Sequence, residues 1–156
     1  MIEIVVEDRG WRTAEPRSVS LARRAALATL AAEGHEAAGL AILLTDDERV
    51  AGLNTRFRGK QGSTNVLSFP ATSPSPDHLG DIALALGVCV REASAQGKSL
   101  ADHLQHLAAH GVLHLLGYDH ESEAEALIME AKERAILAGL GVADPYAERG
   151  AQGDHG

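Results

Sequence analysis

Histidines dominate one short stretch of this 156-residue chain and could bind a metal ion. Residues 110–120 read HGVLHLLGYDH, so His110, His114 and His120 accompany a glycine at 117. On a helix, residues four apart project from one face, and His110 and His114 can direct ring nitrogens at one ion about 2.0–2.1 Å away. His120 would lie on the far side if the helix continued. Gly117, however, can adopt the left-handed conformation that ends a helix and turns the chain back, so the spacing predicts a three-histidine metal site.

The predicted ligands indicate a catalytic metal rather than a structural one. Structural zinc sites are often closed by cysteine, whereas Cys89 is the only cysteine of this chain and lies outside the histidine stretch. Three neutral imidazoles leave a coordination position open, as catalytic zinc sites do. We therefore expect one bound Zn²⁺, although imidazoles also accept other divalent transition metals by affinity.

Three neighbouring residues have two interpretations each. His103 and His106 fall on the same helical stripe as His110 and His114, so they either orient the site and line its approach or are ordinary solvated or supporting histidines. Asp119 either bonds a ligand imidazole or acts on the bound water, or it caps the following helix. The sequence leaves both alternatives open.

The same histidine spacing occurs in the long zinc motif of metzincin peptidases, H-E-x-x-H-x-x-G-x-x-H. Gly111 stands where those enzymes carry the glutamate that acts as general base, and glycine has no side chain to accept a proton. This difference argues against peptide hydrolysis. A substrate that depends more on charge neutralisation, such as a phosphodiester, suits the site better.

One segment reverses the acidic character of the chain. With 14 basic and 22 acidic residues the formal net charge is −8, which would repel nucleic acids and acidic membranes. Residues 49–76 nevertheless contain four bases and no acid; the bases are Arg49, Arg56, Arg58 and Lys60. Guanidinium groups and flexible glycines could hold phosphates here. Alternatively, these cations simply favour the negative end of a solvated helix.

Length and composition indicate one globular domain. At 156 residues the chain is close to the usual size of a single domain. No apolar run approaches the roughly 20 residues that span a bilayer, and residues 1–8 carry acids where a signal peptide needs bases. We therefore expect a cytoplasmic protein, which agrees with the single cysteine.

Hydrophobic periodicity and capping signals predict the elements that position these residues. We expect strands at residues 2–7, 39–44, 65–69 and 80–86, and helices at 18–33, 45–57, 87–96, 99–116 and 121–140. Thr45 and Glu48 suggest a capping box, and the proline- and serine-rich residues 72–78 suggest a loop. The expected architecture is a single α+β domain over residues 1–143, a mixed sheet of about four strands packed with helices, with a metal-binding helix at a cleft. Residues 144–156 are expected to form a flexible tail.

Three further strings accompany the histidine motif: LNTRFRGK at residues 53–60, TNVLSFP at 64–70 and LGDI at 79–82. With residues 110–120, they resemble the YbeY family of bacterial rRNA maturation factors, and the resemblance extends over residues 2–146. It implies an α+β fold with a metal in a cleft, and a metal-dependent, single-strand-specific endoribonuclease of 16S rRNA 3′-end maturation and ribosome quality control. It also implies that His110, His114 and His120 bind the metal, usually zinc, and that Arg58 is the essential basic residue of the cleft.

We therefore predict an endoribonuclease in which Arg58 and His114 are catalytic, Arg56, Arg58 and Lys60 contact RNA, and one Zn²⁺ is held by the three histidines of residues 110–120. The expected partners are single-stranded RNA, 16S rRNA and the small ribosomal subunit. We expect no binding to a membrane or to DNA. Two alternatives remain: a metallohydrolase of another substrate, and a ribosome-assembly factor that acts mainly by binding.

Overall fold

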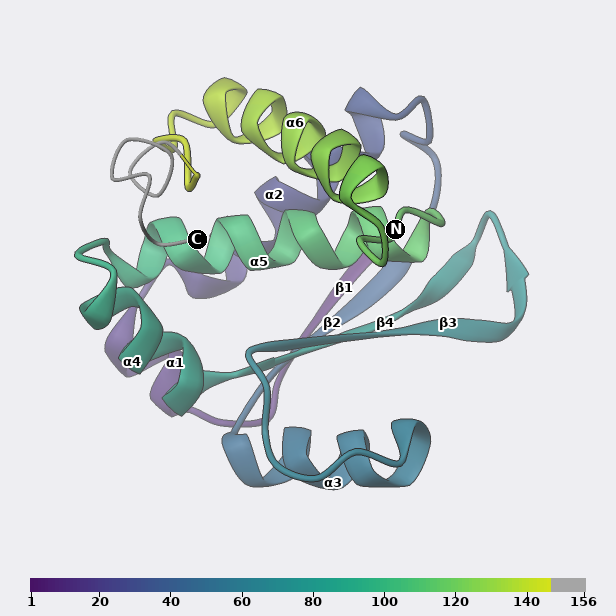
Figure 1. Cartoon of the computed structure of the whole chain (residues 1–156). Coiled ribbons are helices and arrows are strands. Elements are labelled where there is room, and N and C mark those ends of the chain that lie inside the picture. Colours follow the sequence, from purple (N-terminus) through teal and green to yellow (C-terminus); the bar gives the residue numbers. More distant parts are fainter. Residues whose placement is uncertain (147–156) are drawn as a thin grey trace.

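The computed structural model describes residues 1–146 and consists of a four-stranded sheet with helices on both faces (Figure 1). The strands are β1 (Ile2–Val6), β2 (Leu40–Thr45), β3 (Val66–Ser75) and β4 (His78–Ala85). The helices are α1 (Gly10–Ala14), α2 (Ser18–Ala32), α3 (Asp47–Arg58), α4 (Leu86–Ala95), α5 (Leu100–Leu115) and α6 (Glu123–Gly139). The strand order is β1-β2-β4-β3. Strands β1, β2 and β4 are parallel to one another, and β3 is antiparallel to β4. This arrangement confirms the predicted α+β fold with a mixed sheet.

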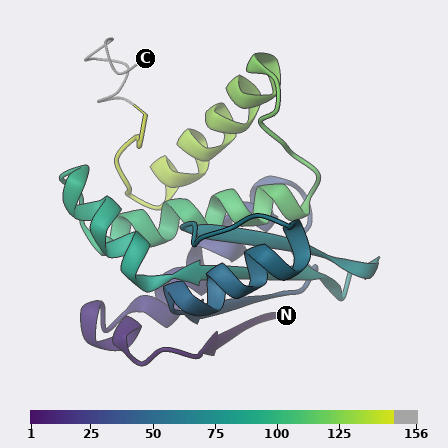
Figure 2. The ribbon, with the colours of Figure 1, turned by 60° about the horizontal axis from the view of Figure 1, so that its bottom comes forward.

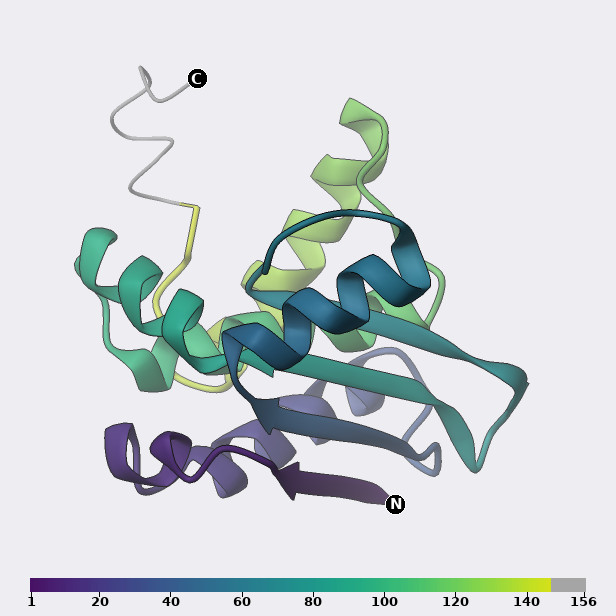
Figure 3. The same ribbon diagram turned by 90° about the horizontal axis from the view of Figure 1, so that it is seen from below.

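The helices form layers that separate the two faces of the sheet. Helices α2 and α5 pack on one face, whereas α3 lies against the other, across β3 and β4 (Figures 1 and 3). Helix α6 packs on α5, so that α5 lies between α6 and the sheet (Figure 2). Helix α5 is therefore covered on two sides, by the sheet and by α6.

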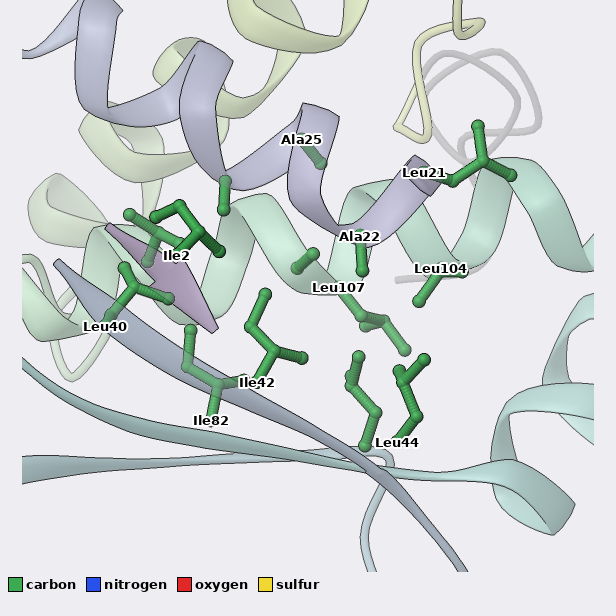
Figure 4. Close-up of a cluster of buried hydrophobic side chains, with 14 of the residues drawn as sticks. Ile2, Leu21, Ala22, Ala25, Leu40, Ile42, Leu44, Ile82, Leu104 and Leu107 are labelled. Atoms are coloured by element: carbon green, nitrogen blue, oxygen red, sulfur yellow. The ribbon is translucent and has the colours of Figure 1, made fainter. Parts of the chain in front are cut away.

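An aliphatic core fixes α5 against the sheet (Figure 4). Leu104 and Leu107 of α5 belong to the same buried cluster as Ile42 of β2 and Ile82 of β4. The central strand β2 is an almost continuous apolar run because helices cover both faces of this part of the sheet. Buried alanines on α2 allow that helix to approach closely. The helix that carries the histidines is thus rigidly positioned.

The hairpin of β3 and β4 is longer than the sequence pattern predicted. Strand β3 continues through Pro70 to Ser75, so the prediction of a loop over residues 72–78 was wrong. Proline is tolerated there because β3 is an edge strand, where a missing backbone N–H need not break a ladder. The strand pairing is irregular between Pro70 and Ser75.

Two further details, the cap of α3 and the presence of a short helix α1, differ from expectation. Asp46 caps α3, since its side chain accepts a hydrogen bond from the backbone N of Arg49 at 2.7 Å, and Thr45 is instead the last residue of β2. The short helix α1 was not predicted. It buries Trp11, whose indole Nε1 donates to the carbonyl oxygen of Thr45 at 2.9 Å and so ties α1 to the sheet.

Within residues 1–146, no helix has both the length and the apolar character needed to cross a bilayer. The expected tail, residues 144–156, lies outside the described residues from 147 onward. Of its first three residues, Asp144 accepts a hydrogen bond from Nε of Arg134 at 3.2 Å, and the Tyr146 hydroxyl donates to Glu133.

Candidate metal centre

Helix α5 carries His110 and His114 of the motif, and the turn that follows the helix brings His120 beside them. The Ser99 hydroxyl caps its start by accepting from the backbone N of Asp102 at 3.0 Å. At its end Gly117 has φ +103°, while Tyr118 N donates to the Leu113 carbonyl and Gly117 N to that of His114, both at 3.0 Å. These two bonds form a Schellman motif, which glycine allows because it has no Cβ. The predicted role of Gly117 in reversing the chain is confirmed.

The three histidines of the motif converge on one point. One ring nitrogen from each of His110, His114 and His120 lies within 4.8 Å of the others. The Nε2 atoms of His110 and His114 are 3.1 Å apart, close to the roughly 3.3 Å between two ligands of a tetrahedral zinc ion. Burial, together with the neighbouring His110 and His120, lowers the pKa of His114 and so favours the neutral imidazole that a metal requires. The triad can therefore bind a metal ion.

A buried carboxylate supports the triad through hydrogen bonds. The sequence pattern did not predict it. Glu133 of α6 accepts hydrogen bonds from Nδ1 of His110 at 2.8 Å and Nε2 of His106 at 2.7 Å, and its side chain is only 1% exposed. Although burial alone would raise its pKa, the hydrogen bonds from His106 and His110 lower it to about 2. With its Nδ1 proton held by a carboxylate, His110 has Nε2 as the ring nitrogen that could bind a metal ion.

The sequence contains a signal that could have revealed Glu133. Helix α6 buries Met129, Ile136 and Leu137, and Glu133 lies on the same stripe, four residues from two of them. An acid on the apolar face of a helix needs a buried partner, because an unpaired charge in that position is very costly.

The end of α3 and the loop that follows it line one cavity together with the histidines. Gly59, with φ +67°, ends α3, and Asn54 Nδ2 donates to the Gly62 carbonyl at 2.9 Å, which folds the loop back on the helix. Arg58 and Lys60 then line a cavity of about 590 Å³ together with the three histidines. Arg56 lies outside this cavity and lines an adjacent one. The structure thus joins two groups of residues that are about fifty positions apart in the sequence.

Comparison with known proteins identifies the family. Residues 6–141 match the family model described as Endoribonuclease YbeY. The chain belongs to the endoribonuclease YbeY family. A relative from Maricaulis maris, named Endoribonuclease YbeY, is 49% identical over 145 residues, which cover 93% of this chain and 91% of the relative. The relative of that name from Azorhizobium caulinodans is 50% identical over 153 residues, covering 94% of this chain and 96% of its own.

A solved structure shares the fold of this chain. The solution structure of TM1509 from Thermotoga maritima aligns with a TM-score of 0.60 at 23% identity, over 90% of this chain and 91% of the other. Membership of the YbeY family does not favour the two alternatives, a metallohydrolase with another substrate and a factor that acts mainly by binding.

In this YbeY family member, His103 and His106 are not solvated. His103 is buried and its Nε2 is 2.9 Å from Oε1 of Glu92. His106 shares Glu133 with His110, which places it behind the metal ligands rather than among them. His106 therefore supports the triad through Glu133, whereas His103 bonds Glu92 instead. The interpretation of the two histidines as solvated residues is wrong.

Asp119 also has a defined place. It does not cap α6, because Ser122 and Glu125 form the capping box of that helix. One Asp119 carboxylate oxygen accepts from the backbone N of His120 at 2.7 Å and lies 3.9 Å from Nδ1 of the same residue. This bond stabilises the turn that brings His120 to the triad.

A second contact restrains the same turn. The Tyr118 hydroxyl donates to Glu33, the residue that follows α2, and Nζ of Lys132 of α6 donates to the same carboxylate at 3.1 Å. Burial opposes ionisation of Glu33, but these two hydrogen bonds outweigh it and lower the pKa of the carboxyl. The segment between Gly117 and His120 is thereby attached to two helices, which limits the positions that His120 can adopt.

Gly111 occupies the place of the peptidase glutamate but faces the sheet. A Cβ atom on Gly111 would lie 2.9 Å from Cγ2 of the buried Ile82 and 3.2 Å from the Ser68 hydroxyl oxygen. That hydroxyl donates to the Gly111 carbonyl at 3.0 Å, which joins β3 to α5. Glycine is favoured here because the helix packs so close to β4 that a Cβ atom would crowd the Ile82 side chain.

We expect Gly111→Ala to lower the free energy of unfolding by about 1 kcal/mol, because a steric cost of about 1–3 kcal/mol exceeds a gain in helix propensity of about 1 kcal/mol. Urea unfolding measures the change. Gly52→Ala is the matched control, since Gly52 is exposed within α3 with open space around its Cα, and it should stabilise the protein slightly. Equal stabilisation by both substitutions would contradict the packing argument.

Proposed function

We propose that this chain is a metal-dependent endoribonuclease that cuts single-stranded RNA, with the 16S rRNA of the small ribosomal subunit as its natural substrate. The observation that carries the proposal is the shared cavity, in which three histidines that can bind a metal lie beside two cations. The names of the family model and of the relatives support RNA as the substrate. A cytoplasmic location follows from a ribosomal substrate, and residues 1–143 would form the catalytic domain.

The metal ligands in this proposal are His110, His114 and His120, and the ion is Zn²⁺. When bound, the ion supplies a Lewis acid beside the phosphate that is cut. Glu133 holds the Nδ1 proton of His110 and thereby fixes the ring that presents Nε2. The supporting contacts of Asp119 and Tyr118 hold the turn before His120 in place.

The cations of the cavity stabilise charge on the substrate. The guanidinium of Arg58 and the ammonium of Lys60 face the cavity without forming an ion pair with any acid of residues 1–146. They are therefore free to hold phosphate oxygens, where negative charge grows during cleavage. Asp119 and Glu121 are the carboxylates that line the cavity in the described part of the chain.

Arg58→Glu tests this proposal directly. We expect kcat/KM for single-stranded RNA to fall about 10²–10³-fold, since one donor to developing charge is lost and an acid takes its place. Thermal unfolding should change little because Arg58 is exposed. Purified protein loaded with zinc is assayed against labelled single-stranded RNA, duplex RNA and casein.

Arg23→Glu is the matched control, because Arg23 is exposed on α2 and does not line the cavity. It should cut RNA at the wild-type rate. Cleavage of casein but not of RNA by the wild-type protein would refute the proposed function, and equal rates for the two variants would refute the role of Arg58.

A further inference from the structure

A second cavity lies on the face of the sheet that α5 does not cover. It has a volume of about 960 Å³ and lies between α3 and the strands β3 and β4. Figure 3 shows α3 lying across this face of the sheet. Four residues line both this cavity and the metal cavity: Arg58, Lys60, Ser68 and Pro70. The two cavities therefore meet along β3 and the end of α3, and a linear polymer bound at the metal could extend into the second one.

The second cavity contains an exposed aromatic ring. Phe57 of α3 is 62% exposed, although large apolar rings are usually buried. The Phe69 ring packs edge to face against it, with centroids 5.5 Å apart at 63°. The guanidinium carbon of Arg56 lies 5.7 Å from the Phe57 centroid. Phe69 supports the ring, and the remaining surface is available for stacking.

The charge of the second cavity favours a polyanion. Its lining includes four cations and one carboxylate, Asp81, which pairs with His78 at 3.4 Å. Arg49 is partly neutralised by Glu7 at 3.5 Å. The other three cations, Arg56, Arg58 and Lys60, form no ion pair with an acid in residues 1–146. Such a combination of cations around an aromatic ring is typical of surfaces that bind single-stranded nucleic acid.

We infer that the second cavity is a subsite for unpaired nucleotides flanking the cleaved bond, in which Phe57 stacks on a base while Arg56 and Lys60 hold phosphates. The inference rests on the proposed endoribonuclease function and deepens it. In a duplex, each base is already stacked and paired, and it cannot also cover Phe57. The subsite thus provides a physical reason for a preference for single strands.

Cleavage kinetics of the zinc-loaded protein test the subsite, with single-stranded RNA substrates of about 12 and about 4 nucleotides, within the range of site sizes known for such surfaces. Phe57→Ala should raise KM for the long substrate about 5- to 150-fold with little change in kcat, because one stacked base is lost. The increase should be several times smaller for the short substrate, which occupies less of the subsite. Phe57→Trp preserves a stacking ring and should keep KM near the wild-type value.

Two further measurements make the outcome decisive. In the Phe57→Trp variant, the long RNA should quench the fluorescence of the new indole. The fluorescence of Trp11 should stay constant, because Trp11 is fully buried. Leu127→Ala removes a side chain that is 65% exposed on α6 and should leave both KM values unchanged. If Phe57→Ala matches Leu127→Ala, or raises KM equally for both lengths, the subsite is refuted while the nuclease function stands. If the wild-type protein cuts neither substrate, the proposed function itself fails.

Discussion

His114→Ala is expected to abolish RNA cleavage, with a fall in rate of about 10³-fold or more, because it removes the central ligand of the triad and with it the bound Lewis acid. Nε2 of His114 lies 3.1 Å from Nε2 of His110, and the two imidazoles that remain hold a metal only weakly. Metal analysis of the purified variant should give well under one zinc per chain. Its fold should persist, since His114 is only half-buried and lies outside the core.

His35→Ala is the matched control, because His35 is exposed and does not line the metal cavity. It should keep full zinc content and full cleavage. A His114→Ala protein that still binds one zinc and cuts RNA would refute the assignment of the triad. Normal ribosome assembly in cells carrying only the inactive variant would instead favour a factor that acts by binding.

Glu133→Ala should have the largest effect on stability. Its buried carboxylate accepts hydrogen bonds from His106, His110 and Tyr146, so its removal takes away the acceptor that these three side chains share. We expect the free energy of unfolding to fall by about 3 kcal/mol and zinc affinity by about 10- to 100-fold. Urea unfolding and calorimetric zinc titration measure the two effects separately. Loss of stability without loss of zinc affinity would show that Glu133 is only structural.

Glu133→Gln keeps the shape of the side chain and removes its charge, so it isolates the effect of ionisation. The pKa of Glu133 is lowered from 4.5 to about 2, and a lowered pKa stabilises the folded state when the group is ionised. That stabilisation is complete above the ordinary value of 4.5 and disappears as the pH falls toward about 2. The stability difference between the metal-free wild-type protein and Glu133→Gln should therefore shrink over this interval.

Local spacing explains why the histidine triad could be predicted and the hydrogen-bond partners of Glu133 could not. Helical geometry places His110 and His114 on one face, and a glycine at 117 can reverse the chain, so both features are encoded within eleven residues. The Glu133 contact depends instead on how α6 packs on α5, which no local pattern specifies.

The same distinction applies to the fold. Period-two and helical patterns predicted the strands and the long helices, because each depends on neighbouring residues. The extension of β3 through Pro70 depends on its place at the edge of the sheet, and that place is a property of the whole topology.

The sequence by itself determined the family, the histidine motif, the turn at Gly117 and the basic character of residues 49–76. Only the tertiary structure decided that Arg58 and Lys60 share a cavity with the histidines, that Arg56 and Phe57 line a neighbouring one, and that Gly111 faces Ile82. The physical reason is that short-range sterics and periodicity act within a few residues. Cavities and buried charge pairs, in contrast, arise from segments that only packing brings together.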